Sequence, residues 1–376
     1  MYVPLFQPWI SSKDAKYTSS ILKKSQLTDG PLLRELEVKF SKFTDSKYAI
    51  GVSNGTAALH LSLMSLDIGK GDEVIIPDMT FVATANAVIN CGATPVLVDV
   101  NPSLNISVES IKKAITKNTK AIIPVHFAGL SCSMSEISRL AKTKNLHIIE
   151  DCAHSLGTFY GTKHVGTFGD TGCFSFYPTK NITSIEGGMV ITNSKKLAEK
   201  IQSLRNHGLS RNLIQRNKIE KPWIYDIKKP GYNYRLDELR SGLAISQLRR
   251  IKEISSHRIK AAKYYTKKLK GKRGIEIMNI DKIKDHVFHL FIIKITKEFG
   301  LSRDEIHTKL FKKGIRTTVH YKPLHLFSYL KKSSQNQIKF QNSTKAYHEC
   351  LTIPLFPTIS KKQQDYVMQN LLQLRK

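Results

Sequence analysis

Short apolar segments alternate with helical segments through the first half of this chain, and this alternation restricts the fold more than any other feature. The apolar segments are rich in Val and Ile, as buried strands are. They cover residues 48–53, 73–77, 94–100, 121–126 and 146–151. The helical segments between them cover residues 57–66, 81–90, 108–115 and 134–144. Strands this apolar, each followed by a helix, predict a parallel sheet with helices on both faces.

Beyond residue 151 the alternation weakens. Two further strands are expected at residues 173–176 and 189–192. From about Arg240 the chain becomes a long lysine-rich helical pattern that runs to residue 270, which predicts a connecting helix. A strand at 287–294 and helices at 303–313 and 361–375 follow.

These elements predict an α/β fold with two domains. A large domain over residues 1–240 would include an N-terminal arm, and a smaller α+β domain would cover residues 241–376. A chain of 376 residues is long enough for two such domains.

Composition excludes several classes of protein. Hydrophobic residues make up 41% of the chain, so a packed core needs no disulfide or metal support. No apolar run is long enough for a membrane helix, and the first residues do not resemble a signal peptide. The scattered cysteines never form a CxxC pair, which predicts no metal site and a reducing, cytoplasmic location. They are Cys91, Cys132, Cys152, Cys173 and Cys350.

Net charge is the unusual property. Lys and Arg number 59 against 30 acidic residues, a formal charge of +29. Such a charge attracts anions, nucleic acid among them. The lysines are spread thinly, however, whereas a nucleic-acid-binding protein concentrates its charge on one face. We expect no nucleic-acid or membrane partner, and keep a non-catalytic DNA-binding role as an alternative.

Polar residues follow the predicted strands at four places, where ligands bind in open α/β sheets. Ser53–Thr56 joins a strand to a helix and suits a phosphate, although a plain helix cap by Asn54 or Thr56 is favoured when these residues are taken alone. Asp151 ends a strand, where a buried carboxylate needs a partner. The alternative to a ligand-binding role is a structural helix cap or ion pair. Lys180 lies in a loop between two strands. It is a candidate nucleophile if it is buried, and an ordinary loop lysine if it faces solvent. Phe81 follows a strand, as a stacking or a core aromatic.

Together these four places suit one cofactor, pyridoxal 5′-phosphate (PLP). The cofactor needs a phosphate site, a stacking aromatic ring, a lysine that bonds to it and a carboxylate at its ring nitrogen. The combination is much more specific than any one of its parts.

The chain resembles the DegT/DnrJ/EryC1/StrS family of PLP-dependent nucleotide-sugar aminotransferases. The matching segments run in family order from Leu27 to His325. They are LTDGPLLRELE, VSNGTAALHLSL, GDEVIIPDMTFVATANAV, GATPVLVDV, EDCAHSLGTFYG, GTFGDTGCFSFYPTKNITSIEGGMV, RNHG, GYNYRLDELRSGLA and VHYKPLH. The resemblance implies PLP-dependent transferase fold type I, with a mostly parallel seven-stranded sheet.

The resemblance also implies residue roles. Lys180 matches the lysine that bonds to the cofactor and moves the proton, and Asp151 matches the partner of the ring nitrogen. His154 matches a position near the phenolic oxygen, where Gln or His is usual, and Phe81 matches the stacking aromatic. The positions that match the phosphate site are Gly55, Thr56 and Ser175.

Asn233 matches an asparagine that reaches the phosphate of the neighbouring subunit, which implies a homodimer. His320, Tyr321 and His325 match the substrate side, with packing at the domain joint as the alternative. Arg235 and Arg316 are candidates for binding the glutamate carboxylate.

The implied reaction moves the amino group of L-glutamate to a nucleotide-linked keto-sugar, with a 4-keto-6-deoxyhexose of the perosamine-synthase kind favoured. A 3-keto-sugar enzyme and a PLP-dependent sugar dehydratase are alternatives. The dehydratases carry His where this chain has Lys180, which favours transamination. Tyr177 departs from a usual His, and residues 183–186 read Thr-Ser-Ile-Glu where Thr-Thr-Gly-Glu is usual.

Overall fold

A seven-stranded sheet forms the centre of the computed structural model, which describes residues 1–24, 26–209, 221, 223–227, 229–278, 286–330 and 339–375. The strand order is β1-β9-β8-β5-β4-β2-β3. The pairs from β3 to β8 are parallel, and β9 pairs antiparallel with both β8 and β1. The strands are β1 (Tyr48–Val52), β2 (Glu73–Pro77), β3 (Thr94–Val98), β4 (Thr119–Ile122), β5 (His147–Asp151), β8 (Thr171–Ser175) and β9 (Gly188–Thr192).

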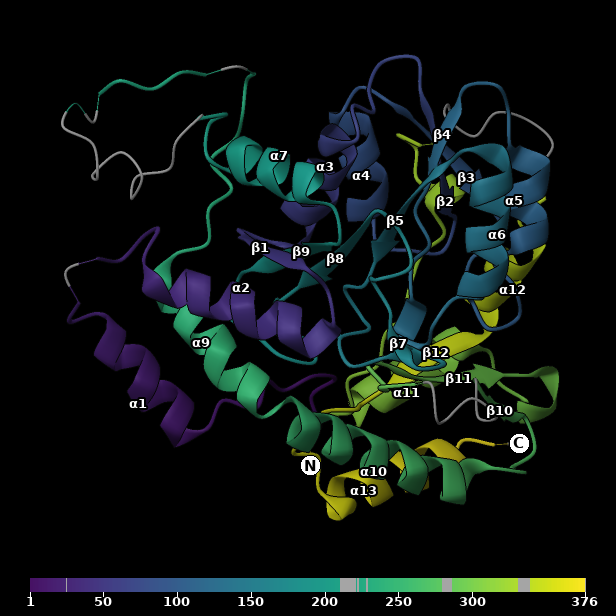
Figure 1. Cartoon of the computed structure of the whole chain (residues 1–376). Coiled ribbons are helices and arrows are strands. Elements are labelled where there is room, and N and C mark those ends of the chain that lie inside the picture. The colour runs from purple at the N-terminus through teal and green to yellow at the C-terminus, as the bar shows by residue number, and fades with distance from the viewer. Residues whose placement is uncertain are drawn as a thin grey trace.

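Helices cover both faces of this sheet (Figure 1). Alternate residues of β2 show why both are needed, since Val74 and Ile76 pack into one apolar cluster and Ile75 into another. One face carries α3 (Gly55–Ser65), α4 (Ala83–Asn90) and α7 (Lys195–Arg205). The other carries α2 (Pro31–Thr44), α5 (Val108–Ala114), α6 (Met134–Lys144) and α9 (Glu238–Arg249).

A three-stranded antiparallel sheet forms a second layer, with α10 and α13 against it in Figure 1. Its apolar side packs on buried rings that include Tyr265 and Phe299. The strands are β10 (Ile275–Ile277), β11 (Phe291–Ile295) and β12 (Cys350–Ile353). The helices nearby are α10 (Ile251–Leu269), α11 (Arg303–Lys312), α12 (Gln341–Glu349) and α13 (Lys361–Leu372).

The remaining elements are short or peripheral. The helix α1 (Ser12–Ile21) packs on α9. A hairpin pairs β6 (Phe159–Tyr160) with β7 (Lys163–His164). The 3₁₀ helices are η1 (Phe127–Gly129), η3 (Lys297–Phe299) and η4 (Leu324–Leu326). Among the described residues, no helix combines the length and the apolar character needed to cross a membrane.

The predicted fold class is confirmed, and each strand and helix expected between residues 48 and 192 is present with ends shifted by a few residues. The predicted connecting helix differs, because it is divided into α9 and α10 at Arg250. At this break the guanidinium of Arg250 pairs with the buried carboxylate of Asp14 at 2.8 Å and with Glu253 at 3.0 Å. The division into domains at residue 240 stays a prediction.

Candidate active site

A cavity of about 530 Å³ lies where β5 and β8 end, at the carboxyl edge of the parallel strands. Ligands bind at this edge in open α/β sheets. Most of the predicted site residues line it, from segments far apart in the sequence. They are Gly55, Thr56, Phe81, Asp151, His154, Ser175, Lys180, His320 and Tyr321.

The beginning of α3 forms one wall of the cavity. Asn54 caps the helix, since its Oδ1 accepts a 2.8 Å hydrogen bond from the Ala57 N–H, so the predicted cap is present. Gly55 and Thr56 still line the cavity. A Cβ atom on Gly55 would lie 2.9 Å from Cβ of Ser175, so only glycine allows these two segments to approach so closely. A helix N-terminus with free N–H groups suits a phosphate.

Asp151 lies at the tip of β5 and is 5% exposed. Its Oδ2 accepts a 3.0 Å hydrogen bond from Thr84 Oγ1, and its Oδ1 accepts a 3.1 Å bond from the Ala153 N–H. Burial raises the pKa of Asp151, and these two bonds and the charge of Lys180 oppose the rise. A carboxylate held by both oxygens in a buried cavity can bind a cationic ring N–H.

Lys180 lies in the loop between β8 and β9 and faces the same cavity. Burial lowers its pKa from 10.5 to about 8, and the carboxylate of Asp151 opposes this change. An amine with a pKa near neutrality is partly unprotonated, so it can act as a nucleophile and as a base.

Histidine and tyrosine rings form the opposite wall. His154 is 5% exposed, and its Nε2 lies 3.1 Å from Oη of Tyr321. Its Nδ1 is buried and has no hydrogen-bond partner among the described residues. Burial holds the pKa of His154 well below its usual value, and the charge of Lys180 adds to the effect. His320 Nδ1 lies 2.9 Å from Thr352 Oγ1, and burial lowers its pKa to about 3.

Phe81 and Tyr177 line the cavity with large exposed rings. Phe81 is 58% exposed, which excludes the core alternative, and its ring centroid lies 5.9 Å from that of Tyr321. Tyr177, the departure from the family pattern, is 48% exposed. Exposed aromatic faces beside a cavity can stack on a planar ligand.

The other predicted residues lie outside the described lining of this cavity. Asn233 is exposed, and its backbone bridges to Asn206. His325 contacts the buried Asp78 instead, with its Nδ1 2.7 Å from Oδ2. Arg235 donates to Oδ1 of Asn206 at 2.6 Å.

Arg316 also lies outside the described lining. Its guanidinium carbon is 3.9 Å from the ring centroid of Phe311 and 5.4 Å from that of Tyr2.

Thr84 and Phe6 are among the cavity residues that were not foreseen. Thr84 lies three residues after Phe81, in the first turn of α4, and the spacing of the helix predicted over residues 81–90 could have identified it. Phe6 comes from the N-terminal segment, and its ring lies 6.3 Å from that of His289. No local pattern in the sequence indicates that Phe6 meets His289, because the contact depends on how the N-terminal segment packs against the second layer.

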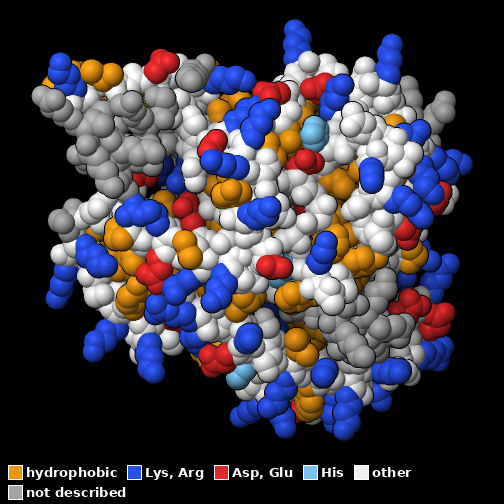
Figure 2. Space-filling model, in the orientation of Figure 1, with side chains coloured by type: hydrophobic (Ala, Val, Ile, Leu, Met, Phe, Trp, Pro, Cys, Tyr) orange, Lys and Arg blue, Asp and Glu red, His pale blue; other side chains and the backbone are white. Residues whose placement is uncertain are grey.

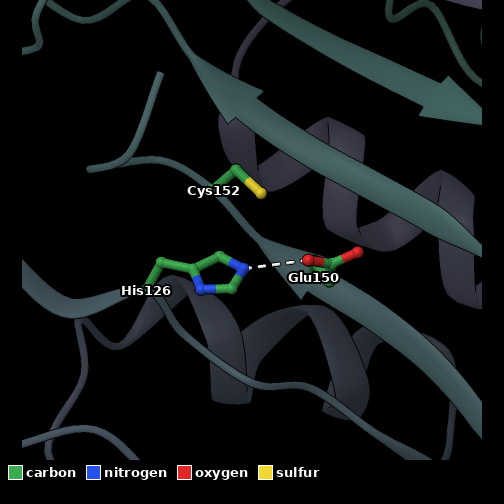
Figure 3. Close-up of side chains that lie close together, drawn as sticks. All are labelled: His126, Glu150 and Cys152. Carbon is green, nitrogen blue, oxygen red and sulfur yellow. Dashed lines mark hydrogen bonds and ion pairs between the residues drawn. The ribbon is translucent and has the colours of Figure 1, made fainter. Parts of the chain in front are cut away.

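A buried cluster behind Asp151 brings together His126, Glu150 and Cys152 (Figure 3). Their potential ligand atoms lie within 4.8 Å of one another. His126 Nδ1 accepts the Cys132 N–H, so its Nε2–H donates to Glu150 at 3.0 Å. Glu150 also accepts three backbone N–H groups, those of Gly166, Phe168 and Gly169. A metal ion would have to break these bonds, so the cluster is better explained as support for β5.

Lys and Arg side chains are scattered over the face of the molecule in Figure 2 and do not gather in one patch. A nucleic-acid-binding surface concentrates them. The visible face therefore gives no support to the DNA-binding alternative.

The residues of the cavity fit PLP. The beginning of α3 suits the phosphate, Asp151 suits the ring nitrogen, and Lys180 is the amine that bonds to the cofactor. The unpartnered Nδ1 of His154 is a buried polar atom that a ligand oxygen would satisfy.

Comparisons with known proteins agree with this fit. The pattern of the DegT/DnrJ/EryC1/StrS aminotransferase family matches residues 8–372. The chain is 34% identical over 372 residues to the spore coat polysaccharide biosynthesis protein SpsC of Bacillus subtilis, covering 98% of this chain and 96% of that one.

Two solved structures share the whole architecture. Helicobacter pylori PseC, an aminotransferase involved in the biosynthesis of pseudoaminic acid, superposes with a TM-score of 0.93 at 28% identity, covering 100% of this chain and 99% of that one. Spr1654 of Streptococcus pneumoniae, in its PLP form, gives a TM-score of 0.91 at 28% identity, covering 100% and 98%.

Proposed function

The chain belongs to the DegT/DnrJ/EryC1/StrS aminotransferase family, which includes PLP-dependent sugar aminotransferases. On that premise we propose that it transfers the amino group of L-glutamate to a nucleotide-linked keto-sugar. The favoured acceptor is a 4-keto-6-deoxyhexose, with a 3-keto-sugar as the alternative. The product is a nucleotide-linked amino sugar for polysaccharide biosynthesis, the process named for SpsC. Five free thiols support a reducing, cytoplasmic location.

One observation carries the proposal: Lys180 faces the same cavity as Asp151, with its pKa lowered to about 8. A dehydratase of this family carries histidine at that position, so the lysine favours transamination over the lyase alternative. When bound, PLP supplies an aldehyde and an electron-withdrawing ring for the transfer of an amino group.

The chain's own residues divide the remaining work. Gly55, Thr56 and Ser175 would hold the phosphate at the beginning of α3. Phe81 would flank the ring, and Asp151 would hold the ring nitrogen in its protonated state. Once the incoming amine has displaced it from the cofactor, the Lys180 amine would be free to move a proton between the two carbons that flank the transferred nitrogen, because its pKa is close to neutral.

His320 and Tyr321 are proposed to face the sugar, since both line the cavity. His325 is left out of this proposal, because its ring contacts Asp78. The lining includes a single lysine and no arginine among the described residues, so the groups that bind the glutamate carboxylate are not assigned.

We also propose a homodimer in which Asn233 reaches the neighbouring cavity. The exposed position of Asn233, outside the lining of its own cavity, supports this arrangement. Mixing inactive Lys180→Ala and Asn233→Ala proteins under conditions of subunit exchange would then restore part of the activity. Mixtures that stay inactive although subunits exchange would contradict shared sites.

The decisive experiment is a panel of nucleotide-linked 3-keto and 4-keto sugars, incubated with glutamate and the PLP-loaded protein. We expect one product with the mass of an amino sugar, together with 2-oxoglutarate. Lys180→Ala should abolish it, whereas Lys163→Ala, on the exposed hairpin strand β7, should not. A deoxygenated sugar without 2-oxoglutarate would identify a lyase instead.

A further inference from the structure

We propose, on the premise of the function above, that Tyr321 is a positioning residue: it fixes His154 as the tautomer that carries its proton on Nδ1. That N–H is thereby reserved as a donor to an oxygen of the bound cofactor. This role differs from the substrate contact suggested by the sequence, because Tyr321 acts here through another residue.

The contact itself joins two distant parts of the chain. Oη of Tyr321 lies 3.1 Å from Nε2 of His154, across 167 residues of sequence. The Tyr321 ring also packs between Phe81, at 5.9 Å between centroids, and Phe127, at 6.1 Å. These two aromatic neighbours restrict the Tyr321 ring beside His154.

The direction of this hydrogen bond follows from the chemistry of its partners. Burial raises the pKa of the Tyr321 phenol and lowers that of the His154 imidazole, so both groups are neutral near pH 7. A phenol O–H is a good donor, and the unprotonated nitrogen of a neutral imidazole is a better acceptor than a phenol oxygen. Tyr321 therefore donates to Nε2, and the proton of His154 is left on Nδ1.

This tautomer leaves a buried donor without an acceptor in the part of the chain that the structure describes. His154 Nδ1 has no partner among the described residues, and the ring packs on His289 at 4.3 Å between centroids. His289 is itself buried, and burial holds its pKa well below the usual range, so it adds no charge beside the N–H. A buried unpaired donor costs free energy until a ligand satisfies it, which makes it a binding determinant.

The first test reads the tautomer directly, in the full-length protein before PLP is added. Histidine labelled with ¹⁵N is observed by long-range proton–nitrogen NMR, and His154 is identified as the signal lost in His154→Gln. We expect a neutral Nδ1–H imidazole in the wild type and loss of that preference in Tyr321→Phe. An Nε2–H form in the wild type would overturn the proposal, whether or not any Tyr321 variant folds.

The second test is a double-mutant cycle on PLP affinity. Tyr321→Phe should weaken PLP binding by about 3- to 10-fold, as the loss of one hydrogen bond does. In a His154→Gln background the same change should cost less than about 2-fold, because an amide has no tautomer to fix. Equal losses in both backgrounds would show that Tyr321 acts only by packing, and would overturn the proposal.

The matched control is Tyr366→Phe, which removes an exposed hydrogen bond to the carbonyl of Lys313 and should leave PLP binding unchanged. The two proposals also fail separately. A wild-type protein that does not bind PLP would contradict the proposed function, while the NMR result would still decide the tautomer.

Discussion

Thr84 Oγ1 donates a 3.0 Å hydrogen bond to Oδ2 of Asp151, and so ties the first turn of α4 to the end of β5. Both side chains are buried, with Thr84 at 1% and Asp151 at 5% exposure. The bond stabilises the ionised carboxylate against the burial that raises its pKa. Thr84 therefore helps to keep Asp151 charged and correctly oriented.

Thr84→Val tests this relationship, because valine keeps the shape of threonine and removes the donor. The pKa of Asp151 should rise further, and kcat should fall by about 10- to 100-fold, as expected for a lost bond to a charged group. Steady-state kinetics with the PLP-loaded protein measure the effect. Thr143→Val, which removes an exposed bond to the Arg139 carbonyl, is the control. Equal kcat in both variants would show that Thr84 does not support Asp151.

A second prediction concerns pH and Lys180. With a pKa of about 8, the amine is mostly protonated at pH 7 and mostly neutral at pH 9. The rate at which the PLP-free protein captures added PLP covalently should rise by about tenfold between these values and then level off, since only the neutral amine attacks. Absorbance after rapid mixing measures this rate.

Asp151→Asn sharpens the same measurement. The carboxylate raises the pKa of Lys180 against the effect of burial, so its removal should move the midpoint of the rate profile to a pH below 8. A wild-type midpoint near 10 would show that the lysine lies in a water-like environment, and an unchanged midpoint in the variant would show that the Asp151 carboxylate does not act on it.

The sequence was most informative where a pattern is local. The apolar run of β2, bounded by Asp72 and Asp78, predicts a strand at residues 73–77, and the structure has it there. The capping residue Asn54 and the position of Asp151 at a strand tip are local in the same sense. Because parallel strands end at one edge of a sheet, such positions also predict that several site residues meet.

Contacts between distant segments are not marked by any local pattern in the sequence. Tyr321 meets His154 across 167 residues and His325 meets Asp78 across 247, and neither pair is marked by spacing or by composition. Arg250, where the predicted helix is broken, likewise pairs with Asp14, far away in the N-terminal segment. Tertiary packing decides these features, so the sequence predicted which residue types form the cavity better than which partners hold them.

A third prediction concerns the approach of two segments at the proposed phosphate site. In Gly55→Ala the new Cβ would lie 2.9 Å from Cβ of Ser175, so the beginning of α3 must shift. We expect PLP affinity to fall by at least about tenfold, while unfolding stability falls by roughly 1–3 kcal/mol from overpacking. Fluorescence titration and urea unfolding separate the two effects.

Gly69→Ala is the matched control, because its Cβ would meet the Cys91 carbonyl oxygen at an ordinary 3.5 Å. It should bind PLP like the wild type. Unchanged affinity in Gly55→Ala as well would place the phosphate elsewhere.

A fourth prediction concerns Asp78, which joins the large sheet to the segment that carries Tyr321. Its carboxylate accepts bonds from the His325 N–H at 2.8 Å, from His325 Nδ1 at 2.7 Å and from Ser343 Oγ at 2.6 Å. Asp78 is fully buried, so Asp78→Ala leaves donors without an acceptor and should cost about 2–4 kcal/mol of unfolding free energy.

Asp67→Ala is the control. Asp67 also has two partners, Lys200 and Lys229, but its side chain is 68% exposed. Exposed ion pairs contribute little, so this loss should stay below about 1 kcal/mol. Urea unfolding of both variants gives the comparison. Asp78 holds His325, and His320 and Tyr321 of the same segment line the cavity. The Asp78 variant should therefore also bind PLP more weakly, whereas Asp67→Ala should not. Similar stability losses in the two variants would show that the joint at Asp78 does not hold this wall of the cavity.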